Sequence, residues 1–317
     1  MKDKIKVFDA FAGYGGATFG MKRANIPHEV IGYSEIKSEA IKIFELNHKG
    51  IKNYGDITKI NPKDLPDFDF FTGGFPCQTF STVGKGHGEL DTRGTLFYDI
   101  IRICEVKQPT FILLENVKGL TMKKHNQTFL KIINELKRIG YNVITELLNT
   151  KDYGLPQNRE RIWIFATKKD IPKGWTFAPK KEELKIFFKD LLDKEVNEKY
   201  YKNQKQAERL IEITGVNLDV KEPSCFDIYN KKIRNDGLSI TITEPYHNTL
   251  RVVEPKKEGK YKVRKMTEKE CFRFMGFKDG EIDLGDLSYV QSGGCAGNGW
   301  DINLAGKIIE NIFKDLG

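Results

Sequence analysis

The chain has 317 residues, of which 39% are hydrophobic and 11% aromatic. These fractions are typical of a folded protein and exclude wholesale disorder, and no run approaches the roughly 18 apolar residues of a membrane span. Lysine and arginine exceed aspartate and glutamate by eight, a balance that suits a polyanionic partner.

The N-terminal residues run directly into a strand-like segment without the apolar region of a signal peptide, so we expect a cytoplasmic protein. The positive charge is uneven, because Lys221 to Lys265 holds eleven basic and six acidic residues. This cluster favours nucleic-acid binding there, although a general drift toward lysine would also explain it.

The five cysteines are not spaced like metal ligands or a disulfide framework; they are Cys77, Cys104, Cys225, Cys271 and Cys295. No CxxC pair occurs, and no histidine lies at ligand spacing from them. We therefore expect no metal site and consider that at least one thiol takes part in chemistry.

The first half of the chain alternates strand-like and helix-like segments. The expected strands are Lys4 to Phe11, His28 to Ser34, Phe68 to Thr72, Phe111 to Glu115, Tyr141 to Leu148 and Arg161 to Ala166. The expected helices are Ala17 to Ala24, Ser38 to Asn47, Thr95 to Val106 and Gln127 to Ile139. Alternation with near-continuous apolar strands predicts an α/β fold whose mostly parallel sheet is covered on both faces.

The pattern changes near Thr167, and a second, smaller mixed domain is predicted beyond it. Lys180 to Gly215 is charged and is expected to be helical. Short strands are expected at Ile240 to Thr243, Leu250 to Val253 and Tyr261 to Val263. Gly293-Gly294 and Gly297-Asn298-Gly299 then precede an amphipathic helix, Ile302 to Phe313; the alternative for the second group is a simple turn. We place the boundaries at 1–176 for a catalytic and cofactor-binding domain, 177–285 for the small domain and 286–317 for a returning segment.

A glycine-rich turn, Ala12 to Gly16, follows the first strand at the sheet edge where ligands bind in such folds. It lacks the third glycine of a dinucleotide fingerprint, which disfavours NAD. Two carboxylates are expected after the second and third strands: Glu35, and Asp56 in Tyr54-Gly55-Asp56-Ile57. A carboxylate at Glu35 suits the ribose hydroxyls of S-adenosylmethionine, and a carboxylate at Asp56 suits its adenine amine. The alternative is a packing turn with two solvated acids.

Cys77 lies in the run Gly74-Phe75-Pro76-Cys77-Gln78, at the carboxyl end of an expected central strand. A lone cysteine is usually a small buried apolar residue, but loops at this edge of a sheet carry chemistry. The glycine-rich stretch Ser81 to Gly94 follows, and its composition suits a lid.

Several motifs occur together and in order: Phe8 to Gly16, Gly74 to Gln78, Glu115-Asn116-Val117, Gln157 to Arg161, Arg264 to Phe277, and Gly297-Asn298-Gly299. In this order they resemble the C5-cytosine DNA methyltransferases of bacterial and phage restriction–modification systems. The resemblance implies a Rossmann-like S-adenosylmethionine-dependent methyltransferase fold with a small target-recognition domain. It runs from about residue 5 to 312 and is weakest from Phe177 to Gly237.

By this resemblance Cys77 is the nucleophile that adds to carbon 6 of a cytosine flipped out of the duplex. Glu115 donates a hydrogen bond at ring nitrogen 3, which requires a raised pKa. Arg161 contacts the base carbonyl and orients Glu115, and Arg159, expected on the same face of the strand, lies nearer the sugar–phosphate or the lid. Without the motifs, Glu115 would be interpreted as a helix cap or ion-pair partner, and the arginines as surface residues.

The resemblance also assigns binding residues. Those expected around S-adenosylmethionine, and its product S-adenosylhomocysteine, are Phe11, Gly13, Gly15, Gly16, Glu35, Ile36, Asp56 and Asn298. Ile36 stands where relatives often have a tryptophan, so this wall is thinner. Ser81 and Thr241 match phosphate contacts, and Val83 replaces a small polar residue that reaches into the DNA in some relatives. Arg234 and Arg251 are our candidates for reading bases in the major groove.

We therefore expect a monomeric DNA (cytosine-5)-methyltransferase that acts on double-stranded DNA at a site of about four base pairs. A restriction endonuclease would share that site without binding the protein, and no membrane is involved. The alternatives are an RNA (tRNA) cytosine-5 methyltransferase of the same fold and a catalytically silent DNA-binding protein. A thiol hydrolase is disfavoured because no histidine motif accompanies Cys77.

Overall fold

The computed structural model describes residues 4–76, 96–217, 220–245, 247, 249–256 and 261–317. The chain forms two compact units. Unit 1 contains Met1–Leu148, Glu160–Pro179 and Leu304–Gly317, and unit 2 contains Asn149–Arg159 and Lys180–Asn303. The division after Pro179 lies close to the predicted boundary at 176, whereas the returning segment begins at Leu304 and residues 149–159 join unit 2.

Unit 1 is built on a six-stranded sheet in the order β2-β1-β3-β4-β7-β5. The strands are β1 (Ile5–Ala10), β2 (His28–Ser34), β3 (Phe70–Gly74), β4 (Phe111–Val117), β5 (Asn142–Asn149) and β7 (Glu160–Thr167). The pairs β1–β2, β1–β3 and β3–β4 are parallel, and β7 runs antiparallel to β4. The predicted α/β fold with a mostly parallel sheet is confirmed.

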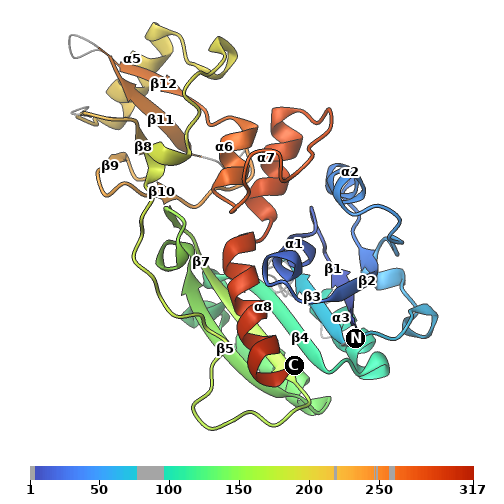
Figure 1. The fold of residues 1–317 in the computed structure, drawn as a ribbon. Coiled ribbons are helices and arrows are strands. Elements are labelled where there is room, and N and C mark those ends of the chain that lie inside the picture. Colours follow the sequence, from blue (N-terminus) through green and yellow to red (C-terminus); the bar gives the residue numbers. More distant parts are fainter. Residues whose placement is uncertain (1–3, 77–95, 218–219, 246, 248, 257–260) are drawn as a thin grey trace, which may run out of the picture. The chain divides into compact units, whose positions relative to one another are not determined.

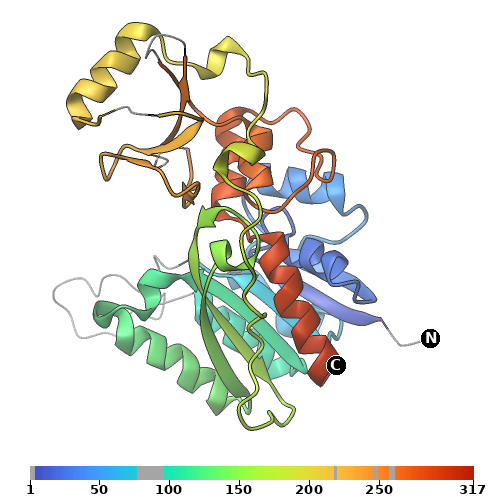
Figure 2. The same ribbon diagram turned by 60° about the vertical axis from the view of Figure 1, so that its left-hand side comes forward.

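Helices cover both faces of this sheet because its strands carry apolar residues on both sides. On one face, Phe71 and Ile112 share a core with α3 (Leu96–Lys107) and α4 (Asn126–Arg138). On the other face, Phe70 and Phe111 contact the ring of Phe313 in α8 (Ile302–Leu316). Figure 1 shows α8 lying across one face of the sheet, and in Figure 2 α4 (green) and α8 (red) lie on opposite sides of it. The remaining helices of this unit are α1 (Gly16–Arg23) and α2 (Ser38–Asn47).

Unit 2 contains a four-stranded antiparallel sheet in the order β12-β11-β8-β9. Its strands are β8 (Ser224–Asp227), β9 (Lys232–Arg234), β11 (Leu250–Pro255) and β12 (Tyr261–Arg264). Helix α5 (Gln204–Thr214) packs on one face of this sheet through a core that contains Ala207, Phe226, Val253 and Val263. A short parallel pair, β6 (Gln157–Asn158) with β10 (Ser239–Ile240), and the helices α6 (Glu268–Arg273) and α7 (Tyr289–Asn298) complete the unit.

One expectation for unit 2 was wrong. Lys180 to Gly215 is helical only in α5 and in two short 3₁₀ turns, Phe188–Leu191 and Glu198–Tyr200. Charge alone does not specify a helix, whereas α5 has a capping box between Asn203 and Gln206 at its start.

The glycines before the last helix belong to α7. Gly293, Gly294 and Gly297 lie within it, and Gly299 is its C-cap. A Cβ at Gly297 would meet the Thr243 carbonyl carbon at 2.4 Å, so close packing explains that glycine.

Candidate functional site

The glycine-rich turn joins β1 to α1 at the carboxyl end of the parallel strands. Its backbone is unusual, because Phe11 has φ 54°, Gly13 φ 56° and Gly15 φ 87°. A left-handed conformation is common for glycine but rare for a bulky aromatic residue, and such strain concentrates at functional sites. Along the Cβ direction of Gly13, no atom of the described residues lies within 4 Å. The turn therefore presents backbone to open space.

Glu35 is held against this turn by backbone donors. Its Oε2 accepts from Gly13 N at 2.9 Å, and its Oε1 accepts from the amides of Ile36 at 2.8 Å and Lys37 at 2.9 Å. A carboxylate has roughly four acceptor positions, so one position on Oε2 is left for a ligand hydroxyl. The side chain of Ile36 beside it is 70% exposed, as a wall of an open site would be.

Asn53, which the sequence analysis did not identify, connects the two predicted cofactor acids. Its Oδ1 accepts from Glu35 N at 3.2 Å and from Gly55 N at 2.9 Å, and its Nδ2 donates to Glu35 O at 3.1 Å. The expectation that Asp56 follows the third strand was wrong, because Asp56 directly follows Gly55, lies before β3 and caps a 3₁₀ turn. Hydrogen bonds from the Thr58 hydroxyl and amide lower the pKa of Asp56. The preference of asparagine for turns was the only available sequence signal.

Asp9 lies in the motif Phe8 to Gly16 and is a buried acid to which the sequence assigned no role. It is 2% exposed, and its Oδ1 accepts from the Thr72 hydroxyl at 2.8 Å. Its Oδ2 has no hydrogen-bond partner among the residues the structure describes. Burial raises the pKa of Asp9 to about 8, opposed by the Thr72 bond and reinforced by the charge of Glu35.

The predicted pair Glu115 and Arg161 is formed in the structure. Arg161 Nε lies 2.8 Å from Glu115 Oε1, and the two side chains are only 14% and 10% exposed. Glu115 pairs with Gly74 of the neighbouring parallel strand. Next to it, Asn116 donates from Nδ2 to Phe75 O at 2.9 Å and so holds the chain two residues before Cys77.

Cys77 and Ser81 lie outside the described residues. The other four cysteines, Cys104, Cys225, Cys271 and Cys295, are all buried. Burial raises the pKa of the thiols of Cys104 and Cys271, and it raises that of Cys225 to about 12. Buried thiols of this kind are poor nucleophiles.

The expectation that Arg159 shares a strand face with Arg161 was wrong. Strand β6 ends at Asn158 and β7 begins at Glu160, so Arg159 lies between strands and belongs to unit 2. Its side chain is 2% exposed, and its guanidinium donates to the carbonyls of Ile242, Gly297 and Gly299. A guanidinium so placed satisfies buried backbone acceptors, and a contact with substrate or lid stays a prediction.

The remaining predicted residues lie in unit 2. Thr241 donates its hydroxyl to Asn158 O at 2.7 Å, and Arg234 is paired with Asp236. Arg251 donates to Leu250 O at 2.7 Å, and burial lowers its pKa. Asn298 is exposed at the end of α7 and donates to Glu244.

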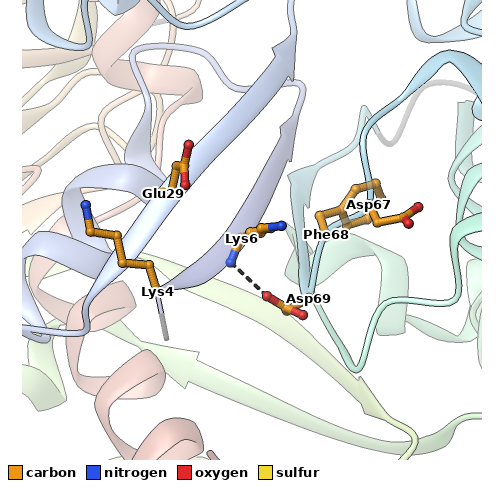
Figure 3. A pocket seen from close by; sticks show the side chains of 6 residues that line it. All are labelled: Lys4, Lys6, Glu29, Asp67, Phe68 and Asp69. Carbon is orange, nitrogen blue, oxygen red and sulfur yellow. Dashed lines mark hydrogen bonds between the residues drawn. The ribbon is translucent and has the colours of Figure 1, made fainter. Parts of the chain in front are cut away.

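A surface pocket lies at the opposite edge of the unit 1 sheet (Figure 3). The residues that line it are Lys4, Lys6, Glu29, Asp67, Phe68 and Asp69. They come from the amino ends of β1, β2 and β3, whereas the glycine turn follows the carboxyl end of β1. The charges of the lining are mixed, and none of the motif residues takes part.

Within the described residues, none of the helices combines the length and the apolar character that a membrane span requires. The same residues contain no group of three or more histidine, cysteine, aspartate or glutamate side chains placed to hold a metal ion.

Comparison with known proteins agrees with this arrangement. The family described as C-5 cytosine-specific DNA methylase matches residues 5–314. Type II methyltransferase M.HaeII of Haemophilus aegyptius is 37% identical over 325 residues, covering 99% of this chain and 94% of that protein. Type II methyltransferase M2.ScrFI of Lactococcus lactis subsp. cremoris is 30% identical over 379 residues, covering 98% and 99%.

Solved structures share the fold. The S. pombe Dnmt2 methyltransferase superposes with a TM-score of 0.73 at 20% identity, covering 99% of this chain and 100% of that one. A putative DNA modification methyltransferase encoded within an E. coli prophage gives 0.69 at 20% identity, covering 98% and 99%. The family match, the full-length relatives and the Glu115–Arg161 pair agree with the resemblance found in the sequence: the chain belongs to the C-5 cytosine-specific DNA methylase family.

Proposed function

We propose that this protein methylates carbon 5 of a cytosine flipped out of double-stranded DNA, with Cys77 as the nucleophile. The observation that carries the proposal is the buried Glu115–Arg161 pair beside Gly74. Only two residues, Phe75 and Pro76, separate Gly74 from Cys77 along the chain. The acid, the arginine and the start of the thiol segment thus share one end of the sheet.

Carbon 5 of cytosine is a weak nucleophile until a thiolate adds to carbon 6 and converts the ring to an enamine. Cys77 would form that bond, and electron density would move toward ring nitrogen 3. Glu115 would supply a hydrogen bond there, and Arg161 would hold both Glu115 and the base carbonyl oxygen. Asn116 would hold the segment that leads to Cys77 in place through its hydrogen bond to Phe75 O.

The residues around the glycine turn fit S-adenosylmethionine, which supplies the methyl group when bound. Glu35 keeps an acceptor position beside the turn, Gly13 faces open space, and Asp9 has a buried oxygen without a described partner. Asp56 would accept from the adenine amine, and Phe11, Gly15, Gly16 and Ile36 would contact the cofactor. Asn298 of unit 2 is a further proposed contact. No metal is needed in this scheme.

The DNA would be bound through unit 2, which carries the basic segment Lys221 to Lys265. Ser81 and Thr241 are proposed phosphate contacts. The Thr241 segment is supported from within the unit, because Gln157 Oε1 accepts from Ile242 N at 3.0 Å and Arg159 donates to Ile242 O. Arg234 and Arg251 remain candidates for base contact, although Arg234 would have to leave Asp236.

We further propose that the protein is the monomeric, cytoplasmic modification enzyme of a restriction–modification system. The type II names of the relatives M.HaeII and M2.ScrFI support this role. A cognate endonuclease would then recognise the same site without binding this protein. RNA methylation remains the second candidate, since Dnmt2-type structures share the fold, but the full-length relatives at 30% identity or more favour DNA.

The decisive experiment combines product mapping with a covalent trap. Bisulfite sequencing of DNA from cells expressing the protein should show one short methylated motif. Duplex DNA carrying 5-fluorocytosine at that motif should form a stable adduct with the wild type at Cys77, because fluorine blocks the final elimination. Cys77→Ser should bind the same DNA without forming an adduct. An adduct on any other cysteine, or methylation found only in RNA, would overturn the proposal.

A further inference from the structure

His48 is a buried histidine that lies against the glycine turn and belongs to none of the sequence motifs. His48 caps the end of α2, where its amide donates to Phe44 O, and its side chain is 5% exposed. The rings of Phe19 and Phe44 pack edge-on against it, with centroids 4.6 and 4.8 Å away. The imidazole is therefore held in one place.

Lys22 of α1 determines which ring nitrogen carries the proton. Its ammonium lies 3.2 Å from His48 Nδ1. A charged ammonium only donates, so while Lys22 is protonated Nδ1 accepts and the ring proton is on Nε2, which has no hydrogen-bond partner among the described residues. Burial, and after it the positive charge of Lys22, lower the pKa of His48 to about 3, while the Tyr14 backbone opposes both. The ring is neutral at physiological pH.

The protonated edge of this ring faces Gly15. A Cβ on Gly15 would lie 2.5 Å from His48 Nε2 and 2.7 Å from its Cδ2. Gly15 N also donates to Ala12 O at 2.7 Å, which closes the turn. The imidazole consequently packs against the turn at Gly15, and Gly13 of the same turn donates to Glu35.

We propose that His48 is a positioning residue for the cofactor, which sets the backbone path of the glycine turn through its contact with Gly15. The inference rests on the proposed binding of S-adenosylmethionine at this turn. It makes His48 a determinant of cofactor affinity that does not touch the reacting atoms. Lys22 acts through His48 by fixing its tautomer.

The first test is calorimetric titration of S-adenosylmethionine into His48→Ala and His48→Gln, together with steady-state kinetics. His48→Ala should weaken binding about tenfold or more, the cost of losing a buried contact that orders the turn. KM for the cofactor should rise with it, while kcat at saturation changes less than about threefold. His48→Gln, which keeps a donor and some volume, should recover part of the affinity. A purely structural role would lower the melting temperature without this division between KM and kcat.

The second test uses the contact itself. Gly15→Ala should weaken cofactor binding, because its methyl group overlaps the imidazole and its φ is unfavourable for alanine. In the double variant Gly15→Ala/His48→Ala the vacated space accepts the methyl group. The double variant should therefore bind at least about threefold better than independent effects predict. If the losses of cofactor affinity are additive, the two residues do not interact, and the proposed role of their contact is wrong.

The matched control is His28, which is also part-buried, has a lowered pKa and contacts Ile26 O at 2.7 Å at the opposite end of β2. His28→Ala should leave cofactor affinity unchanged. Glu35→Ala serves as the pocket control and should weaken binding about tenfold. Unchanged affinity in Glu35→Ala would overturn the proposed pocket. If Glu35→Ala loses cofactor affinity while His48→Ala keeps it, the role of His48 alone would be overturned. Where His48→Ala does not fold, unchanged affinity in His48→Gln would have the same meaning.

Discussion

Arg161 Nε lies 2.8 Å from Glu115 Oε1 across the antiparallel pair β4–β7. Glu115 is opposite Trp163, and Arg161 is opposite Val117, so the two side chains meet diagonally on one face of the sheet. Diagonal neighbours are within reach of long side chains. The pair is thus a consequence of strand register, and a shift by one residue would separate it.

Glu115→Gln should lower kcat by about 10²- to 10⁴-fold, the usual contribution of a positioned acid. The amide keeps the size of the side chain, so calorimetry should show unaltered cofactor binding, and gel-shift titration should show unaltered DNA binding. Glu105, on α3 and outside the site, offers the matched Glu105→Gln control, which should retain full activity. Equal kcat values for the two variants would remove Glu115 from the mechanism.

Asp9→Asn should change the pH dependence of stability. The folded protein raises the pKa of Asp9 from 3.8 to about 8 by burial, so the fold favours the protonated form. Its stabilising effect is complete below pH 4 and is lost as pH rises toward 8, by at most about 1.4 kcal/mol per pH unit. Urea unfolding at several pH values should show the wild type losing stability relative to Asp9→Asn over this interval. Parallel curves would refute the shift.

Glu270→Ala should destabilise unit 2 strongly. Glu270 and Arg264 are both fully buried and joined by two hydrogen bonds of 2.8 and 2.9 Å. Removing one partner of a buried ion pair costs up to about 3–5 kcal/mol, and Arg264 would keep only its pairing with Glu254. Denaturant unfolding measures this, with the exposed Glu212→Ala on α5 expected to stay within about 0.5 kcal/mol of wild type. A similarly small change for Glu270→Ala would contradict the assignment.

Arg234→Ala and Arg251→Ala should distinguish base contact from phosphate contact. A residue that reads a base should, when removed, admit new sequences at one position of the methylated motif. A phosphate contact should instead lower methylation evenly over an unchanged motif and reduce the salt dependence of DNA binding. Genome-wide bisulfite sequencing and binding at several salt concentrations separate the two outcomes. If neither variant alters the methylated motif, the level of methylation or the salt dependence, both arginines are excluded from the DNA interface.

The sequence by itself determined the α/β fold, the order of its elements and the family. Strand–helix alternation is a local property of the chain. For this reason β2 and α2 have the predicted bounds. The ends of the other helices of the first half differ from the predicted ends by about one residue, as is usual for helix ends. Its position after the second strand made Glu35 a candidate, and motifs with fixed spacing made Glu115 and Arg161 candidates, because each follows or occupies a strand end where side chains converge.

Only the tertiary structure decided which side chains meet. Arg159 and Arg161 are two residues apart, yet one is buried among the carbonyls of unit 2 and the other pairs with Glu115. Asn53 and His48 belong to no motif, and their roles arise from contacts with Glu35 and Gly15 across gaps of 18 and 33 residues. Such contacts depend on how elements pack, and periodicity and composition describe only the elements themselves.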